Sequence, residues 1–109
     1  MVLIIEIRFE GDIRPPVGTP IYVEVRDTSL IDAPSKTMAS VTGEVQGRLG
    51  SWLSTVEIDV PKIPDQNTVW AHIDVDSDKR VSRGDFVTTT TYPIKFDMSK
   101  ELTIWVRMV

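Results

Sequence analysis

The 109-residue sequence contains no cysteine and only one histidine. The absence of cysteine excludes a disulfide-stabilised scaffold, a thiol nucleophile, a cysteine zinc site and an iron–sulfur cluster. Long apolar runs are also missing, since the longest, Val2 to Ile5, is far shorter than the roughly 18 residues that a membrane-spanning helix needs. We therefore expect no transmembrane segment.

Positively charged residues are also fewer than negatively charged ones. Twelve Lys and Arg residues stand against sixteen Asp and Glu residues, a formal net charge of -4, and the two signs are interleaved. Because nucleic-acid binding depends on clustered positive charge, we expect no nucleic-acid partner. No basic region followed by an apolar region and a cleavage site opens the chain. We expect a cytoplasmic protein if Met1 is the native start, and a periplasmic or outer-membrane-associated one if a leader was removed.

Alternation of apolar and polar residues dominates the sequence, and this period of two is typical of β-strands. Proline, glycine and aspartate separate the alternating segments, and no helical stripe is long enough for a helix. The pattern predicts seven strands, over residues 2–9, 20–27, 37–46, 52–60, 69–76, 85–92 and 102–108. Seven short strands without crossover helices predict an all-β fold, an antiparallel two-sheet β-sandwich that forms a single domain over residues 1–109.

The odd or even position of a residue along its strand, its parity, predicts whether its side chain faces the core. The inward set comprises Ile5, Ile7, Val23, Val25, Val56, Ile58, Ala71, Ile73, Ile104 and Val106. Residues 37–46 alternate less cleanly, with Gly43 on the face of Ala39, Val41 and Val45, which predicts a bent or bulged strand. Pro93 is expected to end the strand over 85–92 or to move it to another sheet.

His72 is the one residue that suggests acid–base catalysis. It lies on the expected outer face of its strand between Trp70 and Asp74, and no nucleophile elbow or oxyanion loop accompanies it. We interpret it as a surface histidine beside an indole. The enzyme alternative is a small hydrolase or lyase that uses His72 and the Asp74 to Asp85 carboxylates. Such an enzyme would need a concave pocket that converges on these groups, whereas a binding module would show a flat apolar patch or an open sheet edge.

The string DVDSDKRVSRGD resembles a calcium loop, with acidic residues at its first, third, fifth and twelfth positions: Asp74, Asp76, Asp78 and Asp85. Three features argue against a metal. The sixth position holds Lys79 in place of glycine, the twelfth holds a short aspartate, and Lys79, Arg80 and Arg83 add positive charge. The preceding strand is also expected to continue through Asp74 and Asp76, with the carboxylates on a flat face. We expect a solvated loop, no metal, no cofactor, and no effect of calcium on the thermal midpoint.

Large apolar residues occur at outward positions of several strands. Ile4, Trp70 and Trp105 stand opposite complete inward sets, where exposure does not favour folding. Val2, Ile4, Trp105 and Val109 are expected to form one exposed patch if the terminal strands are neighbours. Loops that fold over these residues are the alternative. Because tryptophan anchors protein interfaces, we predict that Ile4, Trp70 and Trp105 bind a protein partner or a second copy of the chain.

Three motifs resemble the YbaY-like lipoprotein family, which includes the YscW-type pilotins of type III secretion. They are a Pro-Pro-Val-Gly turn at 15–18, a D-x-S-x-x-D-A-P loop at 27–34 after a strand, and a T-T-Y-P ending at 90–93. The resemblance implies a small β-sandwich without known catalysis. Its characterised pilotins are lipid-anchored chaperones that bind secretin subunits and bring them to the outer membrane. The chain departs from that family in having no lipid-bearing cysteine. We therefore expect a non-enzymatic protein-binding or assembly module.

Overall fold

A computed structural model describes residues 2–27, 36–46, 54–60, 67–90, 92–94 and 101–109. Within these ranges the chain forms eight strands and no helix. The strands are β1 (Val2–Phe9), β2 (Pro20–Asp27), β3 (Lys36–Glu44), β4 (Ser54–Asp59), β5 (Asn67–Ile73), β6 (Phe86–Thr88), β7 (Tyr92–Ile94) and β8 (Glu101–Met108). Accordingly, the described residues include no helix that could cross a membrane. The all-β prediction is confirmed.

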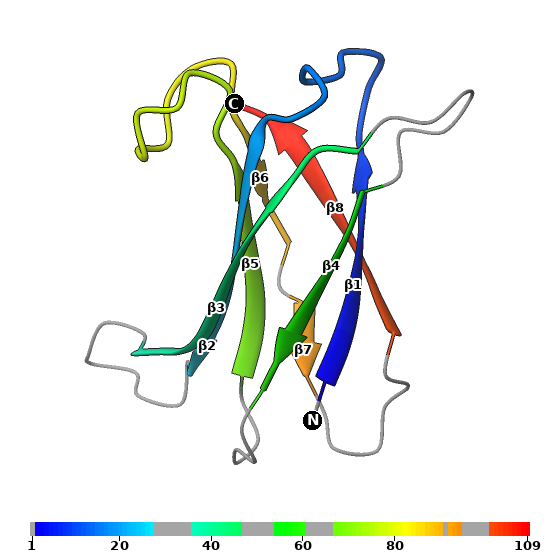
Figure 1. Cartoon of the computed structure of the whole chain (residues 1–109), viewed down its shortest axis with the longest axis vertical. Coiled ribbons are helices and arrows are strands. Elements are labelled where there is room, and N and C mark those ends of the chain that lie inside the picture. Colours follow the sequence, from blue (N-terminus) through cyan, green and yellow to red (C-terminus); the bar gives the residue numbers. More distant parts are fainter. Residues whose placement is uncertain (1, 28–35, 47–53, 61–66, 91, 95–100) are drawn as a thin grey trace.

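The strands form one mixed sheet that curls into a nearly closed barrel (Figure 1). Their order is β3-β2-β5-β6-β8-β1-β4, with β7 paired to β5 beside this path. β1 and β8 run parallel, with Ile4 opposite Glu101 and Phe9 opposite Val106, while the other pairs are antiparallel. The structure does not show the expected antiparallel two-sheet sandwich. Alternation fixes the inward face of a strand but is the same for parallel and antiparallel neighbours, so it could not reveal this arrangement.

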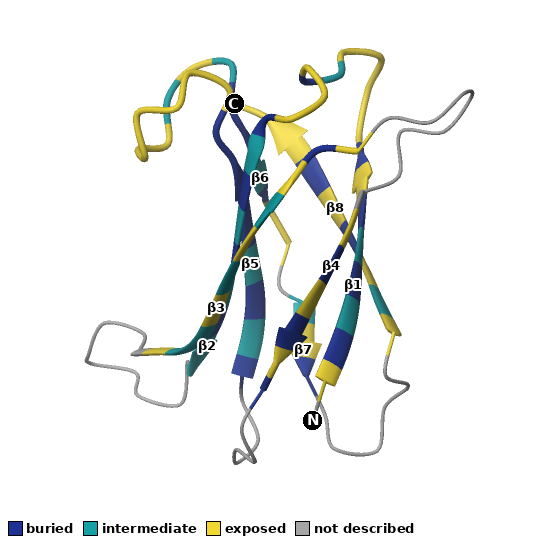
Figure 2. Cartoon of the chain, in the orientation of Figure 1, coloured by how far each residue is buried: buried dark blue, intermediate teal, exposed yellow. Residues whose placement is uncertain are grey.

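Buried and exposed residues alternate along several strands (Figure 2), and the buried apolar residues form one core. All ten residues of the expected inward set are buried, and most of them have no exposed surface. Leu3, Phe9, Ile21 and Phe86 also belong to this core, where the rings of Phe9 and Phe86 meet edge to face with centroids 5.4 Å apart. The prediction of the core from parity is confirmed.

β3 and β4, the strands at the two ends of the sheet order, contact each other at the seam of the nearly closed barrel. At this seam Gly43 faces Val56: a Cβ atom placed on Gly43 would lie 2.7 Å from Val56 Cγ1. Ala39 and Val41 lie on the same strand and are only half-buried, although both pack against the core. The expected bulge is also present, as a register shift beside Val25. Gly43 is therefore a point of close approach between β3 and β4.

Two of the expected strands differ from the structure by more than two residues at one end. The segment predicted over 69–76 ends at Ile73, so Asp74 and Asp76 lie beyond the sheet. The segment predicted over 85–92 splits into β6 and β7, which pair with opposite ends of β5. Pro93 neither ends this segment nor moves it to another sheet, but lies inside β7 opposite Thr68. The backbone therefore leaves the ladder between the two short strands.

Candidate functional site

The three predicted contact residues lie on the outside of the barrel. Ile4 is on β1, Trp70 on β5 and Trp105 on β8, each at a position whose strand neighbours face the core. Trp105 is 43% exposed, whereas Ile4 and Trp70 are half-buried. Trp105 is thus the most accessible indole among the described residues, and the described parts of the chain leave much of it uncovered. The loop over residues 28–35, the expected alternative cover for such residues, lies outside the described part.

These residues do not form one continuous patch. Trp105 stands opposite Arg8 in the parallel pair β1–β8, so it lies four residues, or about 13 Å, from Ile4 along the strands. Trp70 is on β5, with β6 between it and β8. Val2 and Val109 lie at opposite ends of the parallel pair, so the expected cluster of Val2, Ile4, Trp105 and Val109 is not present. Antiparallel terminal strands would have placed these two ends together.

Each of these two tryptophans has an arginine over its ring. The guanidinium carbon of Arg26 lies 4.4 Å from the Trp70 ring centre, and Glu24 holds this arginine in a 2.7 Å ion pair. The corresponding distance from Arg8 to Trp105 is 6.0 Å. A guanidinium within about 6 Å of an indole face makes a cation–π contact, and the contact is closer at Trp70. The closer arginine contributes to the lower exposure of Trp70.

His72 is buried against the outer face of β5, contrary to the expected surface position. Only 3% of the residue is exposed, because Tyr22, Trp70 and Asp85 surround the ring. The ring centres of Tyr22 and Trp70 lie 5.9 and 5.8 Å from that of His72, so the expected contact with an indole is present. Its Nε2 lies 2.8 Å from Asp85 Oδ2. This contact joins the two ends of the loop over residues 74–85. The spacing of His72 and Asp85 in the sequence did not predict it.

Asp85 collects hydrogen bonds at the end of this loop. Its Oδ1 accepts the Val75 N–H at 2.8 Å, and its Oδ2 accepts the Ser82 N–H at 3.2 Å in addition to the His72 contact. Burial alone would raise the pKa of Asp85, but the hydrogen bonds from His72, Val75 and Ser82 outweigh it and leave the pKa below its ordinary value. The backbone is tied to the C-terminus as well, since the Val109 N–H donates to the Asp85 carbonyl at 2.8 Å.

The other three carboxylates of the loop converge toward Asp85. One oxygen from each of Asp74, Asp76, Asp78 and Asp85 lies within 4.8 Å of the others. This convergence differs from the flat arrangement expected from a longer strand, because β5 ends at Ile73 and the loop then coils. Ser77 and Lys79 both adopt left-handed backbone conformations, with φ of 58° and 62°.

The pKa of Asp76 is lowered, and the largest cause is a hydrogen bond from the Ser82 hydroxyl, whose Oγ lies 2.7 Å from Asp76 Oδ2.

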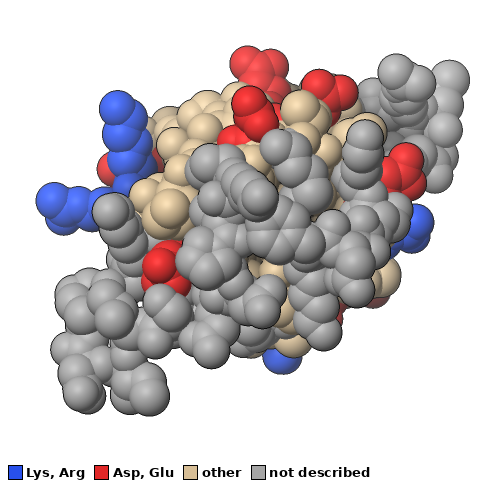
Figure 3. All heavy atoms as spheres, turned by 90° about the horizontal axis from the view of Figure 1, so that it is seen from below, with Lys and Arg blue, Asp and Glu red and all other residues tan. Residues whose placement is uncertain are grey.

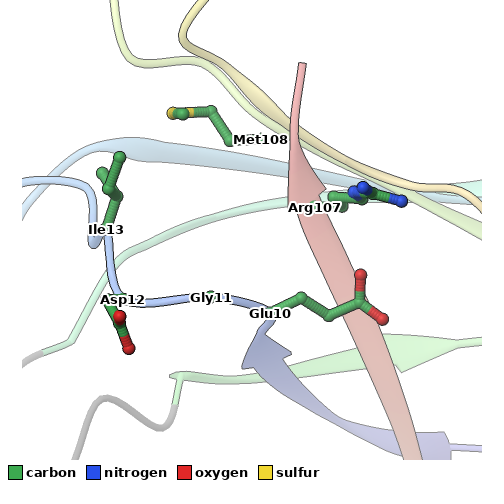
Figure 4. A pocket seen from close by; sticks show the side chains of 6 residues that line it. All are labelled: Glu10, Gly11, Asp12, Ile13, Arg107 and Met108. Atoms are coloured by element: carbon green, nitrogen blue, oxygen red, sulfur yellow. The ribbon is translucent and has the colours of Figure 1, made fainter.

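The geometry gives no support to a hydrolase or lyase built on His72. The hydroxyl of Ser82 lies beside this cluster, but it contacts Asp76 and Asp85 and not the imidazole. A catalytic base must lie within hydrogen-bond distance of the proton that it removes, and no hydroxyl among the described residues is hydrogen-bonded to His72. The described side chains around His72 therefore include no nucleophile–base pair. The pocket in Figure 4 is lined by residues near the end of β1 and on β8, and includes neither His72 nor the loop carboxylates. Its lining residues are Glu10, Gly11, Asp12, Ile13, Arg107 and Met108.

The end of the barrel away from the acidic loop carries described charges of both signs. Figure 3 views this end, and its blue and red side chains are scattered around the periphery of the view without gathering into one basic patch.

Comparison with known proteins identifies a fold but no family. No protein-family description matches the sequence, and none of the curated proteins is similar to it in sequence. Among solved structures, an alternative pilotin from the type II secretion system of Vibrio cholerae aligns with a TM-score of 0.72. The alignment covers 100% of this chain and 96% of the pilotin chain, at 24% sequence identity. The chain has a pilotin-like fold. The expected pilotin resemblance is confirmed at the level of the fold.

Proposed function

We propose that this protein is a non-enzymatic module that binds a protein partner during assembly of a secretion apparatus. The full-length similarity to the Vibrio cholerae pilotin is the observation that carries the proposal, because it includes nearly every residue of both chains. The lack of a nucleophile–base pair among the described residues around His72 agrees with a binding role. The finer assignment to the YbaY-like and YscW-type proteins rests on the motifs at 15–18, 27–34 and 90–93.

We further propose that Ile4, Trp70 and Trp105 contact the partner. Trp105 supports this role best, because a 43% exposed indole beside an arginine offers both apolar area and a charged neighbour. Interface hot spots are enriched in tryptophan and arginine, the two residue types that meet at this position. The contacts would extend over the outer faces of β1, β5 and β8 and would not fill a single pocket. No cofactor is needed for such binding.

The partner that the resemblance suggests is a secretin subunit. For a pilotin-like protein this partner favours a site of action in the periplasm or at the outer membrane. A cytoplasmic protein that begins at Met1 would use the same surface for another partner or for a second copy of itself. Fractionation of cells that express the complete gene product distinguishes these locations.

Trp105→Ser tests the proposed surface. The purified secretin subunit from the same genome is titrated into the wild type and the variant by calorimetry, and urea unfolding of each protein alone reports its stability. Loss of an anchoring tryptophan typically costs about 2 kcal/mol or more of binding, so affinity should fall about 30-fold. The stability of the isolated protein should change little, since much of the side chain already lies in solvent. Arg107→Ser on the same face of β8 is the matched control and should retain binding.

Two results would contradict this proposal. A large loss of stability for Trp105→Ser with unchanged binding would show that the chain's own residues cover this indole. Equal binding by wild type, Ile4→Ser, Trp70→Ser and Trp105→Ser would place the contact elsewhere, with the β3–β4 seam next to be tested. Sedimentation of the protein alone over a range of concentrations measures self-association, which should weaken in the Trp105→Ser variant if a second copy is the partner.

A further inference from the structure

The loop between β5 and β6 gathers oxygen ligands in the order that a calcium-binding loop uses. Asp74, Asp76 and Asp78 occupy its first, third and fifth positions and Asp85 its twelfth, and their oxygens lie within 4.8 Å of one another. Calcium is held by six to eight oxygen atoms at about 2.3–2.6 Å, drawn mainly from carboxylates and backbone carbonyls. Four carboxylates this close repel one another unless a positive charge lies between them.

Asp74 provides a second observation that points to a ligand. The residue has no exposed surface, yet its Oδ1 has no hydrogen-bond partner among the described residues. Its other oxygen, Oδ2, accepts the Lys79 N–H at 2.8 Å, which holds the carboxylate against the loop. A buried carboxylate oxygen without a partner is strongly unfavourable. This carboxylate is one of the four that converge, so a cation held by them would lie beside the side chain that carries the unpartnered oxygen.

The basic residues of the loop do not neutralise these carboxylates. Lys79, Arg80 and Arg83 are exposed, and in the described part of the chain none of their side chains forms an ion pair. Lys79 also takes up the left-handed backbone, with φ of 62°, that glycine usually provides at the sixth position. Two of the sequence-based reasons against calcium are therefore removed. The remaining one, the short aspartate at position twelve, weakens such a site without abolishing it.

We propose that Asp74, Asp76, Asp78 and Asp85 form a divalent-cation site with a preference for calcium. An all-oxygen donor set favours a hard cation such as calcium over zinc or copper. The imidazole of His72 is already engaged with Asp85, so it supports the carboxylate and does not complete the metal's shell. Asp85 replaces the usual bidentate glutamate and both its oxygens accept hydrogen bonds. We therefore expect an affinity in the weak range of calcium modules, with a Kd of about 10⁻⁴ to 10⁻³ M.

Calorimetry and thermal unfolding on the full chain test this site. The protein is first treated with a chelator and dialysed, and calcium chloride is then titrated to about ten times the upper expected Kd. One ion per chain should bind, and the thermal midpoint should rise by about 5 °C or more at the end point. Asp76→Asn and Asp78→Asn change exposed residues, so both variants should fold but bind calcium at least tenfold more weakly.

Asp12→Asn is the matched control, because it makes the same change at an exposed aspartate outside the loop. It should bind calcium like the wild type. Absence of both heat and a midpoint shift in the wild type would overturn the proposal. Equal weakening in the control would also overturn it, since calcium would then respond only to net charge. Binding of zinc chloride without binding of calcium, lost in His72→Gln, would refute the calcium assignment and indicate a nitrogen-containing site of His72, Asp74 and Asp85.

Discussion

We expect the close approach of β3 and β4 to depend on the absence of a side chain at Gly43, and Gly43→Ala tests this directly. The added Cβ atom would lie 2.7 Å from Val56 Cγ1, closer than two carbon atoms can approach without a shift. Val56 cannot rotate away freely, because it is β-branched and buried, and its strand is paired with β1. Overpacking of this kind costs about 1 to 3 kcal/mol. We expect Gly43→Ala to lower the free energy of unfolding by that amount.

The same substitution should have the opposite sign once the contact is removed. The backbone of Gly43 lies outside the left-handed region, so alanine is compatible with its conformation. Alanine in a strand interior is more favourable than glycine by roughly 0.5 to 1 kcal/mol. In a Val56→Ala background, where Cγ1 is absent, Gly43→Ala should therefore be neutral or stabilising. The two effects together predict a coupling energy between the sites of roughly 1.5 to 4 kcal/mol.

A double-mutant cycle measures this coupling. The wild type, both single variants and the double variant are unfolded in urea, with tryptophan fluorescence and far-ultraviolet circular dichroism as two probes. Coincident transitions would justify a two-state treatment of the four proteins. If Gly43→Ala changed stability equally in both backgrounds, the close approach of β3 and β4 would not be the reason for glycine, and the steric explanation of the seam would be refuted.

Three further substitutions test the interior and the contact between β7 and β8. Ile58→Ala and Ile104→Ala should each cost about 2 to 5 kcal/mol in urea unfolding, because both side chains are buried in the core, and a cost below about 1 kcal/mol would contradict that placement. Tyr92→Phe should cost about 0.5 to 1.5 kcal/mol, since the Tyr92 hydroxyl accepts the Trp105 N–H at 2.9 Å. Hydrogen exchange at the Trp105 amide should become faster in that variant, and unchanged exchange would argue against the bond.

The interior of the barrel could be predicted from the sequence because a strand has only two faces. Parity alone places Ile5, Val23 and Ile104 on the inner face, and the structure buries all three. The pairing of the strands and its direction could not be predicted in the same way. The parallel pairing of β1 with β8 depends on how the whole chain curls, and the alternation of residues 2–9 is the same beside any neighbour. The error in pairing direction led directly to the error about Val2 and Val109.

The outer face of β5 shows a second limit of parity. His72 points away from the core, as its position predicts, yet it is buried because Tyr22, Trp70 and Asp85 pack around it. Burial on an outer face depends on neighbouring strands and on the loop that returns to Asp85. Trp105, at an equivalent outward position on β8, has no such cover among the described residues and stays 43% exposed. Parity therefore identified candidate surface residues but could not rank them.

The conformation of the acidic loop could not be predicted from residue preferences, because two of its residues adopt a backbone conformation that their residue types disfavour. Left-handed backbone is unfavourable for residues other than glycine by roughly 1 to 2 kcal/mol each, so Lys79 at the sixth position argued against a coiled loop. The structure nevertheless places both Ser77 and Lys79 there. A conformation of this kind persists only where its surroundings favour it. The Lys79 N–H donates to the buried Asp74, and Asp85 is held by His72 and by two backbone N–H groups, so contacts at both ends of the loop favour the coil. A bound cation would add a third favourable contribution at the centre, where the carboxylates otherwise repel.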